Sequence, residues 1–246
     1  MNSLLSRITV LGIADGEPMA LALRDRVVMA ELIAGGARHL AHFPDARGER
    51  FVIGNNIAEL VARLRGALAG DESAVVLASG DPLLYGIGAT LRRHFAAEQL
   101  EIIPAVSSVQ RAFAALGEPW HDALLLTAHG RPGEAVIAAL TPLRKAAILT
   151  DAIDTPARLA GLLLNANGDC PAAVCERLGT PEQRLRRGTL SEIAHQTFDP
   201  LNVMVLLPEA SPPDDSAFGV PDEALEHDGL ITHLEVRAVS IAYLRG

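Results

Sequence analysis

Residues 74–88, Ala-Val-Val-Leu-Ala-Ser-Gly-Asp-Pro-Leu-Leu-Tyr-Gly-Ile-Gly, form the stretch that decides the fold. The apolar run from Ala74 to Ala78 has the length and composition of a buried strand. The glycine, aspartate and proline that follow it are typical of a turn. From Leu84 to Phe95 the apolar residues suit a helix with one buried face. A strand, a turn and a helix in this order form the repeating unit of α/β proteins.

The same alternation continues on both sides of this stretch and predicts an α/β fold for the first half of the chain. Apolar residues at helical spacing predict a further helix from Ile57 to Leu68. The other strands predicted here are Arg7 to Ile13, Phe51 to Ile53 and Leu100 to Ile103. Strands that alternate with helices form a largely parallel sheet that is covered on both faces.

The pattern is interrupted at Leu116-Gly117-Glu118-Pro119-Trp120, where glycine and proline disfavour a continuous helix. A second series follows. Its predicted strands are Leu124 to Ala128, Ala146 to Leu149, Ala172 to Arg177, Gln183 to Arg187 and Val203 to Leu207, and its predicted helices are Gly133 to Leu140, Pro156 to Ala166 and Leu190 to Gln196. We therefore expect two α/β domains, residues 1–117 and 118–208, each with a mixed, mostly parallel sheet flanked by helices.

After Pro208 the composition changes to that of an exposed linker. Residues 209–216 are acidic and rich in proline, and only one helix-like segment, Leu234 to Leu244, follows. A single segment cannot bury a core of its own. We therefore expect residues 209–246 to be a linker followed by the start of a second, absent domain.

The composition excludes several classes of protein. The 246 residues are 49% apolar with a formal net charge of −9, which is typical of a globular chain with an aliphatic core. An acidic total argues against broad nucleic-acid binding. Eight of the 30 acidic residues but only two of the 21 basic ones lie in residues 209–246. The rest of the chain is therefore close enough to neutral to form a basic cleft for an anionic substrate.

Export and membrane insertion are not expected either. The apolar runs are strand-sized, well below the roughly 18–20 residues that a bilayer span needs, and Met1 to Arg7 lack the regions of a signal peptide. Cys170 and Cys175 are too few for a disulfide framework and have no His or Cys partner at ligand spacing. We expect a cytoplasmic protein without a metal site, whose cysteines are small core residues.

Three turns that follow predicted strands are candidate binding sites, because ligands of open parallel sheets bind at the carboxyl ends of the strands. The first turn, Gly12 to Gly16, departs from the dinucleotide-binding pattern, since Ala14 and Glu17 stand where that pattern needs glycine. The alternative for this turn is a tight connection between a strand and a helix.

The second and third turns allow two interpretations each. After Ala78, the carboxylate of Asp81 could accept hydrogen bonds from a ligand or cap a helix. After Ile103, the hydroxyls of Ser107 and Ser108 suit a ligand and equally suit the start of a helix. Taken alone, the serines favour capping.

Together, these motifs resemble the tetrapyrrole (precorrin) methyltransferases. The resemblance rests on a strand-ending Gly-x-x-x-Gly turn, on Ser-Gly-Asp-Pro-x-x-Tyr-Gly at residues 79–86 and on Pro-Ala-Val-Ser-Ser-Val-Gln at residues 104–110. Three more stretches are similar to one branch, the precorrin-7 C5-methyltransferases of cobalamin biosynthesis: Gly-Gly-Ala-Arg-His-Leu at 35–40, Leu-Gly-Glu-Pro-Trp-His-Asp-Ala at 116–123 and His-Gly-Arg at 129–131. The resemblance covers residues 8–207.

The resemblance implies that S-adenosylmethionine binds in a cleft between the two domains. The residues that it implies for cofactor binding are Ser79, Gly80, Asp81, Leu84, Ser107, Ser108, Ala128 and His129. The family's usual Gly-x-Gly at the first turn is replaced here by Gly12-Ile13-Ala14. The added methyl group of Ala14 disfavours close approach of the substrate or the cofactor to this turn.

The resemblance also implies how the reaction proceeds. The cofactor is already activated, so methyl transfer depends on alignment in a dry pocket more than on a strong base. His129 and Asp15 are candidates for proton handling, with a histidine in a turn and a helix cap as the alternatives. Precorrins carry acetate and propionate groups, which arginine binds well. The candidate substrate residues are Arg38, His39, Arg111 and Arg131, each of which could instead be an ordinary surface residue.

The end of the chain resembles the junction in bifunctional precorrin-6Y C5,15-methyltransferases, at residues 218–222 and 229–238. The expected function is methylation of carbon 5 of a precorrin. We expect the protein to be a homodimer. Its expected partner is a C15-methylating, decarboxylating methyltransferase domain, which either follows on the same chain or is a separate protein. Two alternatives stay open. One is a methyltransferase of this fold that acts on another tetrapyrrole position or on RNA, and the other is a non-catalytic domain that holds the precorrin.

Overall fold

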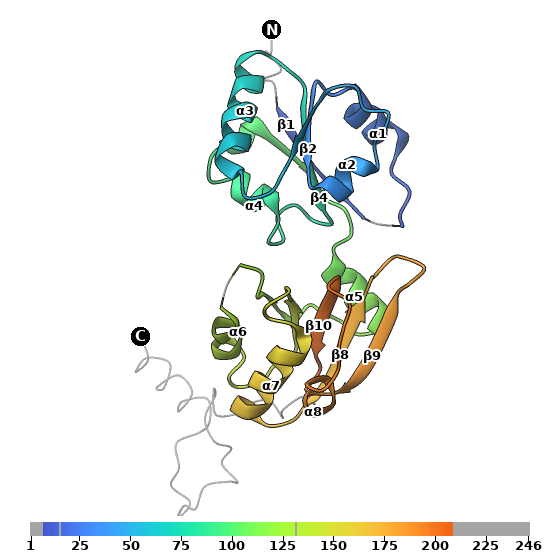
Figure 1. Cartoon of the computed structure of the whole chain (residues 1–246), viewed down its shortest axis with the longest axis vertical. Coiled ribbons are helices and arrows are strands. Elements are labelled where there is room, and N and C mark those ends of the chain that lie inside the picture. Colours follow the sequence, from blue (N-terminus) through green and yellow to red (C-terminus); the bar gives the residue numbers. More distant parts are fainter. Residues whose placement is uncertain (1–6, 15, 131, 209–246) are drawn as a thin grey trace, which may run out of the picture.

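The computed structural model describes residues 7–14, 16–130 and 132–208, which form two α/β units, each around a five-stranded sheet (Figure 1). The strands of the first unit are β1 (Ile8–Ile13), β2 (Leu32–Gly35), β3 (Glu49–Val52), β4 (Ala74–Ser79) and β5 (Leu100–Ile103). Its helices are α1 (Leu21–Met29), α2 (Ala37–Ala41), α3 (Ile57–Ala69), α4 (Ile87–Leu91) and the short 3₁₀ helix Ala97–Gln99.

The first sheet has the strand order β3-β2-β4-β1-β5, and these neighbours pair in parallel. Successive residues of a strand point to opposite faces, and both faces are covered by helices. Val10 and Val76 pack with Leu60 of α3, whereas Leu11 and Val75 pack on the other side with α1 and α2. Burial on both faces explains why these strands are continuously apolar instead of alternating.

The second unit follows helix α5 (Ser108–Leu116). Its strands are β6 (Leu124–Thr127), β7 (Ala146–Leu149), β8 (Pro171–Glu176), β9 (Arg184–Thr189) and β10 (Asn202–Leu206), and its helices are α6 (Gly133–Ala139), α7 (Pro156–Asn167) and α8 (Leu190–Ile193). Ile148 and Val174 face α6, α7 and α8, while Ala147 and Cys175 face α5. The inner strands β7, β8 and β10 of this sheet are therefore also buried on both faces, whereas the edge strand β9 is largely exposed.

The expectation of a mostly parallel sheet is confirmed for the first unit and wrong for the second. The order there is β6-β7-β10-β8-β9, and of the neighbouring pairs only β6 and β7 run parallel within the described residues. Residues 177–183 join β8 to β9, and such a link is too short for the crossover of a dozen or more residues that a parallel pair needs. The chain therefore turns back on itself at this point.

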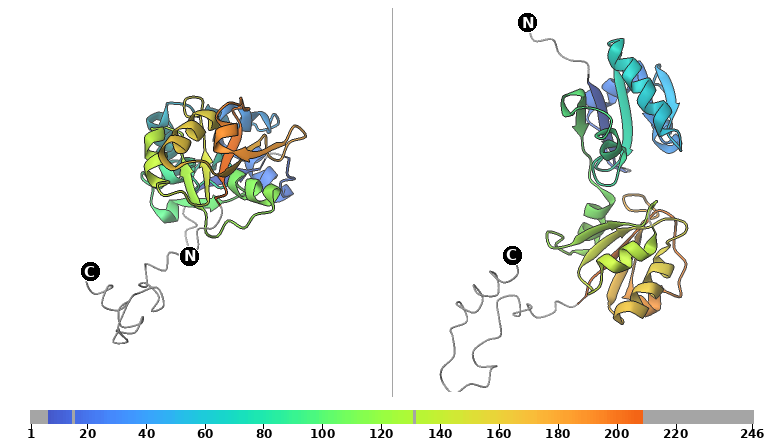
Figure 2. Two further views of the ribbon diagram at one scale, coloured as in Figure 1. Left: turned by 90° about the horizontal axis from the view of Figure 1, so that it is seen from below. Right: turned by 90° about the vertical axis from the view of Figure 1, so that its left-hand side faces the viewer.

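Helix α5 belongs by its packing to the second sheet. Its apolar face, which includes Val109 and Phe113, packs against Cys175 and Val205. The chain crosses from one unit to the other as it enters this helix (Figures 1 and 2). The boundary near residue 118 stays a prediction, and the packing of α5 favours a boundary before Ser108 instead.

Most predicted elements have counterparts in the structure, but two differences stand out. The strand β2 and the helices α1 and α2 were not expected, because four buried residues such as Leu32–Gly35 show no period that could identify a strand. The helix predicted from Leu84 to Phe95 is wrong at both ends, since α4 is only Ile87–Leu91. Tyr85 has φ +54°, outside helical geometry, so α4 begins only at Ile87.

No helix in the described part of the chain is both long enough and apolar enough to cross a membrane. The predicted linker and the helix-like segment at 234–244 lie outside the described residues.

Candidate functional site

The carboxyl ends of β1 and β4 lie side by side where the connections of the first sheet diverge. From β1 the chain goes to β2 on one side, and from β4 it goes to β5 on the other side. Such a switch point leaves a crevice, which is the usual ligand site of open α/β sheets. Hydrogen bonds tie the turns together here: the N–H of Gly80 donates to the carbonyl of Ile13 (2.8 Å), and the N–H of Ala105 donates to the carbonyl of Gly80 (3.2 Å).

Two glycines make this close approach of main chains feasible. A Cβ on Gly12 would lie 2.0 Å from the carbonyl oxygen of Gly80, and a Cβ on Gly80 would lie 2.8 Å from the Cα of Ser107. Gly80 also has φ +56°, which other residues rarely adopt. The tight-turn alternative therefore accounts for Gly12, whose missing side chain makes room for the neighbouring turn.

A cavity of about 530 Å³ lies in front of these turns, a size in the usual range for small-molecule sites. The first unit lines it with the β4–α4 turn, the β5–α5 turn and the start of α2. The second unit lines it with the ends of β6, β7 and β8 and the start of β10. The cavity thus lies between the two units, where the fold class implies a cofactor cleft.

The predicted cofactor residues gather at this cavity with one exception. Those that line it are Ser79, Gly80, Asp81, Leu84, Ser107, Ser108 and His129. Ala128 is fully buried and packs in the core of the second unit with Val136 and Ile148. Lining places a residue within reach of a ligand, and the role of each in binding stays a prediction.

Two of these polar side chains, those of Asp81 and Ser107, form hydrogen bonds within their own turns. One carboxylate oxygen of Asp81 accepts the N–H of Leu83 (2.8 Å), so it stabilises the turn and does not cap α4. Ser107 is buried and caps α5, because its hydroxyl accepts the N–H of Gln110 (3.2 Å). Ser108 is exposed at the cavity, so the two adjacent hydroxyls have different surroundings.

The predicted substrate residues are less uniform. Arg38 and His39, on α2, line the cavity. Arg111 lines it as well, but its guanidinium lies 2.8 Å from the carboxylate of Glu17 and donates to the carbonyl of Leu178 (3.4 Å). Arg111 thereby links residues on both sides of the cavity. The other two candidates, Asp15 for proton handling and Arg131 for the substrate, lie outside the described residues.

Helix α2 and strand β4 bring three polar side chains together on the cavity wall. The Oγ of Ser79 lies 2.9 Å from Nε2 of His39, and Nη2 of Arg38 donates to the same oxygen at 3.4 Å. Ser79 is exposed to the cavity and directly precedes Gly80. His129, the other histidine that lines the cavity, is held through its main chain, which donates to the hydroxyl of Thr127 (3.1 Å).

Tyr85 connects the two walls of the cavity. Its left-handed backbone, φ +54°, directs the ring toward the second unit, where the hydroxyl donates to the carbonyl of Leu125 in β6 (2.5 Å). On the second wall, the hydroxyl of Thr150 donates to the side-chain oxygen of Asn202 (2.8 Å). Both residues line the cavity, so this pair joins the ends of β7 and β10 at the site.

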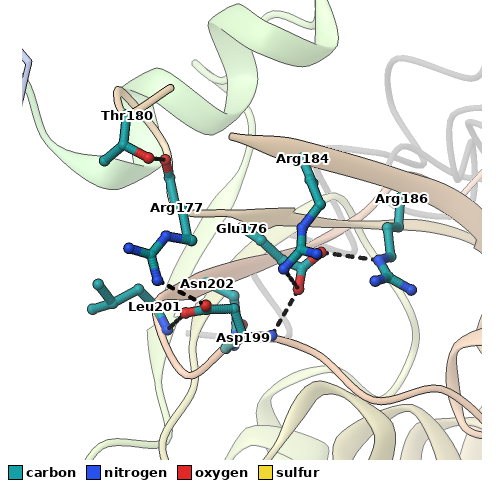
Figure 3. Close-up of polar contacts among 8 residues, drawn as sticks. All are labelled: Glu176, Arg177, Thr180, Arg184, Arg186, Asp199, Leu201 and Asn202. Atoms are coloured by element: carbon teal, nitrogen blue, oxygen red, sulfur yellow. Dashed lines mark hydrogen bonds and ion pairs between the residues drawn. The ribbon is translucent and has the colours of Figure 1, made fainter. Parts of the chain in front are cut away.

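A buried carboxylate supports the second wall from behind (Figure 3). Glu176 is fully buried and accepts the N–H of Asp199 (2.7 Å) and Nε of Arg186 (2.9 Å). The next residue, Arg177, pairs with the carboxylate of Asp199 (3.0 Å). The N–H of Leu201 and the Arg177 guanidinium lower the pKa of Asp199. These bonds hold the turn that leads into β10 and contributes Leu201 and Asn202 to the cavity.

The two cysteines are core residues, as predicted. Cys170 packs in the core of the second unit, and Cys175 is fully buried against α5, where it borders the cavity. Burial raises the pKa of the Cys170 thiol and raises that of Cys175 to about 11. Both thiols therefore stay protonated at neutral pH and are poor nucleophiles.

Sequence reasoning missed most of the second wall. The residues concerned are Thr127, Thr150, Arg177, Leu178, Thr180, Leu201 and Asn202. A usable signal was available, because most of them lie at the ends of predicted strands, where ligand sites of α/β sheets occur. The direction of β10 was the obstacle, since its amino end, and not its carboxyl end, faces the cavity.

Known proteins are similar to this chain in both sequence and fold. The family model of the tetrapyrrole (corrin/porphyrin) methylases matches residues 9–194. The cobalt-precorrin-7 C(5)-methyltransferase of Salmonella typhimurium is 37% identical over 205 residues, which cover 82% of this chain and 99% of that protein. The precorrin-6Y C(5,15)-methyltransferase (decarboxylating) of Sinorhizobium sp is 33% identical over 255 residues, which cover 96% of this chain and 59% of that protein.

Solved structures confirm the α/β fold class. The cobalamin biosynthesis precorrin-6Y methylase from Archaeoglobus fulgidus has a TM-score of 0.63 at 23% identity, covering 85% of this chain and 100% of that one. A uroporphyrin-III C-methyltransferase from Thermus thermophilus, complexed with S-adenosylhomocysteine, has a TM-score of 0.61 at 24% identity, covering 82% and 92%. The family match at 9–194 takes in most of both units, and so the chain belongs to the tetrapyrrole (corrin/porphyrin) methylase family.

Proposed function

We propose that this protein is an S-adenosylmethionine-dependent methyltransferase that methylates carbon 5 of a precorrin, precorrin-7 or its cobalt form, in cobalamin biosynthesis. The observation that carries the proposal is the match to the Salmonella cobalt-precorrin-7 C(5)-methyltransferase, 37% identical over 99% of that protein's length. That match is long enough to take in both units. The cavity between the units is the site at which we propose that the reaction occurs.

The shape of the first wall fits the cofactor. Since Gly80 has no side chain and φ +56°, its turn packs directly against the main chain of Ser107 and lines the cavity with main-chain atoms. Ser79, Asp81 and Leu84 lie on the same turn. We assign this turn to the cofactor, chiefly through main-chain contacts. Of the two serines, Ser108 is the better donor to the methionine end, because Ser107 is occupied with capping α5.

When bound, S-adenosylmethionine supplies a methyl group on a positively charged sulfur, already activated for displacement. The residues of this chain position the two reactants and exclude water. Apolar side chains that line the cavity, Leu77, Val106 and Leu149 among them, keep it dry. Arg38 on α2 is our candidate for the carboxylates of the precorrin, together with Arg111 and Arg131, and His39 lies beside Arg38 on the same wall.

One pair of measurements tests the proposal. Calorimetric titration of the full chain with S-adenosylhomocysteine should show saturable binding. Incubation with precorrin-7 and methyl-labelled S-adenosylmethionine should give a product that mass spectrometry shows to be heavier by one labelled methyl group at carbon 5. Label at another position would favour a different tetrapyrrole methylase, and precorrin binding without transfer would favour a non-catalytic holding domain.

We also propose a cytoplasmic homodimer that works with a C15-methylating, decarboxylating methyltransferase domain. The support for the partner is the Sinorhizobium relative, whose name includes both positions and of whose length this chain matches 59%. Mixing the protein with a separately produced C15-methylase should then convert precorrin-6Y to a doubly methylated product. Sedimentation of the purified protein would test the dimer.

A further inference from the structure

A proton has to leave the macrocycle during the proposed reaction. The carbon–carbon bond forms with an electron pair of the macrocycle, while the sulfur keeps the pair of the broken carbon–sulfur bond and becomes a neutral thioether. The macrocycle thereby gains one positive charge. Loss of one proton, from the methylated carbon or from a conjugated ring nitrogen, restores its neutral form. A group that accepts this proton at the cavity wall would speed the reaction.

The wall formed by β4 and α2 holds a hydroxyl and an imidazole in hydrogen-bond contact. Oγ of Ser79 and Nε2 of His39 are 2.9 Å apart, and both residues line the cavity. Ser79 directly precedes Gly80, on the turn that we assign to the cofactor. Helix α2 is anchored to the sheet by the buried Leu40, which fixes the imidazole beside the end of β4.

The neighbouring arginine occupies one acceptor site of the serine oxygen. Arg38 donates to Oγ of Ser79 at 3.4 Å, and a guanidinium can only donate. The serine oxygen therefore accepts from Arg38, and its own proton stays available for Nε2 of His39, which is the direction that we assign to it. In this arrangement the imidazole accepts at Nε2 and carries its hydrogen on Nδ1.

We propose that Ser79 and His39 act together as the proton acceptor of the methyl transfer, an inference that rests on the proposed function. The hydroxyl of Ser79 takes the proton from the methylated macrocycle as it passes its own proton to Nε2 of His39, and the resulting imidazolium releases it to water. No further reactant is needed. Arg38 stabilises the serine oxygen while the two protons move.

Other charged or titratable groups that line the cavity are already engaged or placed elsewhere. Asp81 uses one oxygen on the N–H of Leu83, Arg111 lies against Glu17, and Arg177 pairs with Asp199. His129, on the opposite wall, is the remaining imidazole in the cavity lining of the described residues. It is therefore the rival that the experiment has to separate from His39.

The test measures single-turnover methyl transfer to precorrin-7 across the pH range in which histidine titrates. The variants are His39→Gln, which keeps a hydrogen-bonding group near the position of Nε2, Ser79→Ala, and His129→Gln. His94→Gln, an exposed histidine outside the cavity, is the matched control. We expect His39→Gln to lower the rate about 100-fold and to abolish its fall at acidic pH, with little change in affinity for S-adenosylhomocysteine.

Ser79→Ala should lower the rate as well, and added imidazole should restore part of the rate of His39→Gly. The proposal is overturned if His39→Gln and Ser79→Ala keep the wild-type rate and pH profile, or if the acidic fall disappears in His129→Gln instead. A purely structural role for His39 would lower the affinity or the melting temperature without changing the pH profile. If the wild type transfers no methyl group to any precorrin, the proposed function fails, and not this inference alone.

Discussion

Gly80 shows how one residue joins backbone geometry to ligand access. Its φ of +56° and the 2.8 Å contact that a Cβ would make with Ser107 both disfavour any other residue. We expect Gly80→Ala to lower the free energy of unfolding by about 1–3 kcal/mol, the usual cost of a strained backbone. The same change should weaken S-adenosylhomocysteine binding at least tenfold, because the turn must move. Urea denaturation and calorimetry measure the two effects.

Gly161→Ala is the matched control for this substitution. Gly161 lies inside α7, and a Cβ there would meet no atom within 4 Å. Alanine should therefore raise stability by up to about 1 kcal/mol through its higher helix propensity. If both variants changed stability in the same direction, the assignment of strain to Gly80 would be wrong.

Asp199 gives a prediction about acid stability. The N–H of Leu201 and the guanidinium of Arg177 lower its pKa in the folded protein. Its contribution to stability is therefore present above the unfolded-state value of about 4 and is lost as the pH falls through the folded value. Asp199→Asn should be less stable than the wild type at neutral pH, and the difference should shrink below about pH 4. Denaturation at a series of pH values checks this, and a constant difference would contradict it.

At the scale of one residue, the sequence predicted which residues line the cavity better than it predicted what each of them contacts. The motif around Gly80 predicted the place of the site, yet the capping by Ser107 and the ion pair between Arg111 and Glu17 depend on neighbours that only the folded chain provides. His39 was predicted to contact the substrate. Its partner Ser79 lies 40 positions away in the sequence, on another element, so no spacing rule could reveal the pair.

At the start of helix α5, two adjacent serines separate helix capping from ligand binding. Ser107 caps the helix with its buried hydroxyl, whereas Ser108 faces the cavity. Ser107→Ala should cost about 1 kcal/mol of stability. Ser108→Ala should leave stability unchanged and weaken S-adenosylhomocysteine binding about threefold to tenfold, as expected for one lost hydrogen bond. Equal effects of the two variants on both measurements would contradict this division of roles.

Elements with a clear period or a clear composition were predictable, and the others were not. Helix α3 has an apolar face at Leu60, Val61 and Leu64, so its spacing alone identified it. Strand β2 is too short for a period, and the helix at Leu84 was predicted too early because Tyr85 departs from helical geometry. The antiparallel direction of β9 follows from its short link to β8, whereas the place and direction of β10 depend on how its connection folds, which residue patterns do not encode.

At the scale of the whole molecule, Tyr85 makes a contact across the cavity. Its hydroxyl donates to the carbonyl of Leu125 and so joins the β4–α4 turn to β6. Tyr85→Phe removes this bond, which is worth about 0.5–1.5 kcal/mol, and should weaken S-adenosylhomocysteine binding about threefold to tenfold. Ser191→Ala removes a hydroxyl that bonds Asp169 within the second unit and should leave binding unchanged. Calorimetry of both variants distinguishes a contact between the units from a general loss of stability.

The pairing of β1 with two strands that follow it in the sequence affects how the first unit folds during synthesis. Ile8 pairs with Ala74 on one side and with Leu100 on the other, so β1 needs both β4 and β5 to complete its pairing. During synthesis the ribosome produces β1 first and β5 last in this unit. The apolar strand Ile8–Ile13 therefore has no partner in the nascent chain until β4 has emerged, and one of its edges stays unpaired until β5 has emerged. A chaperone that holds this strand during translation would increase the yield of folded protein.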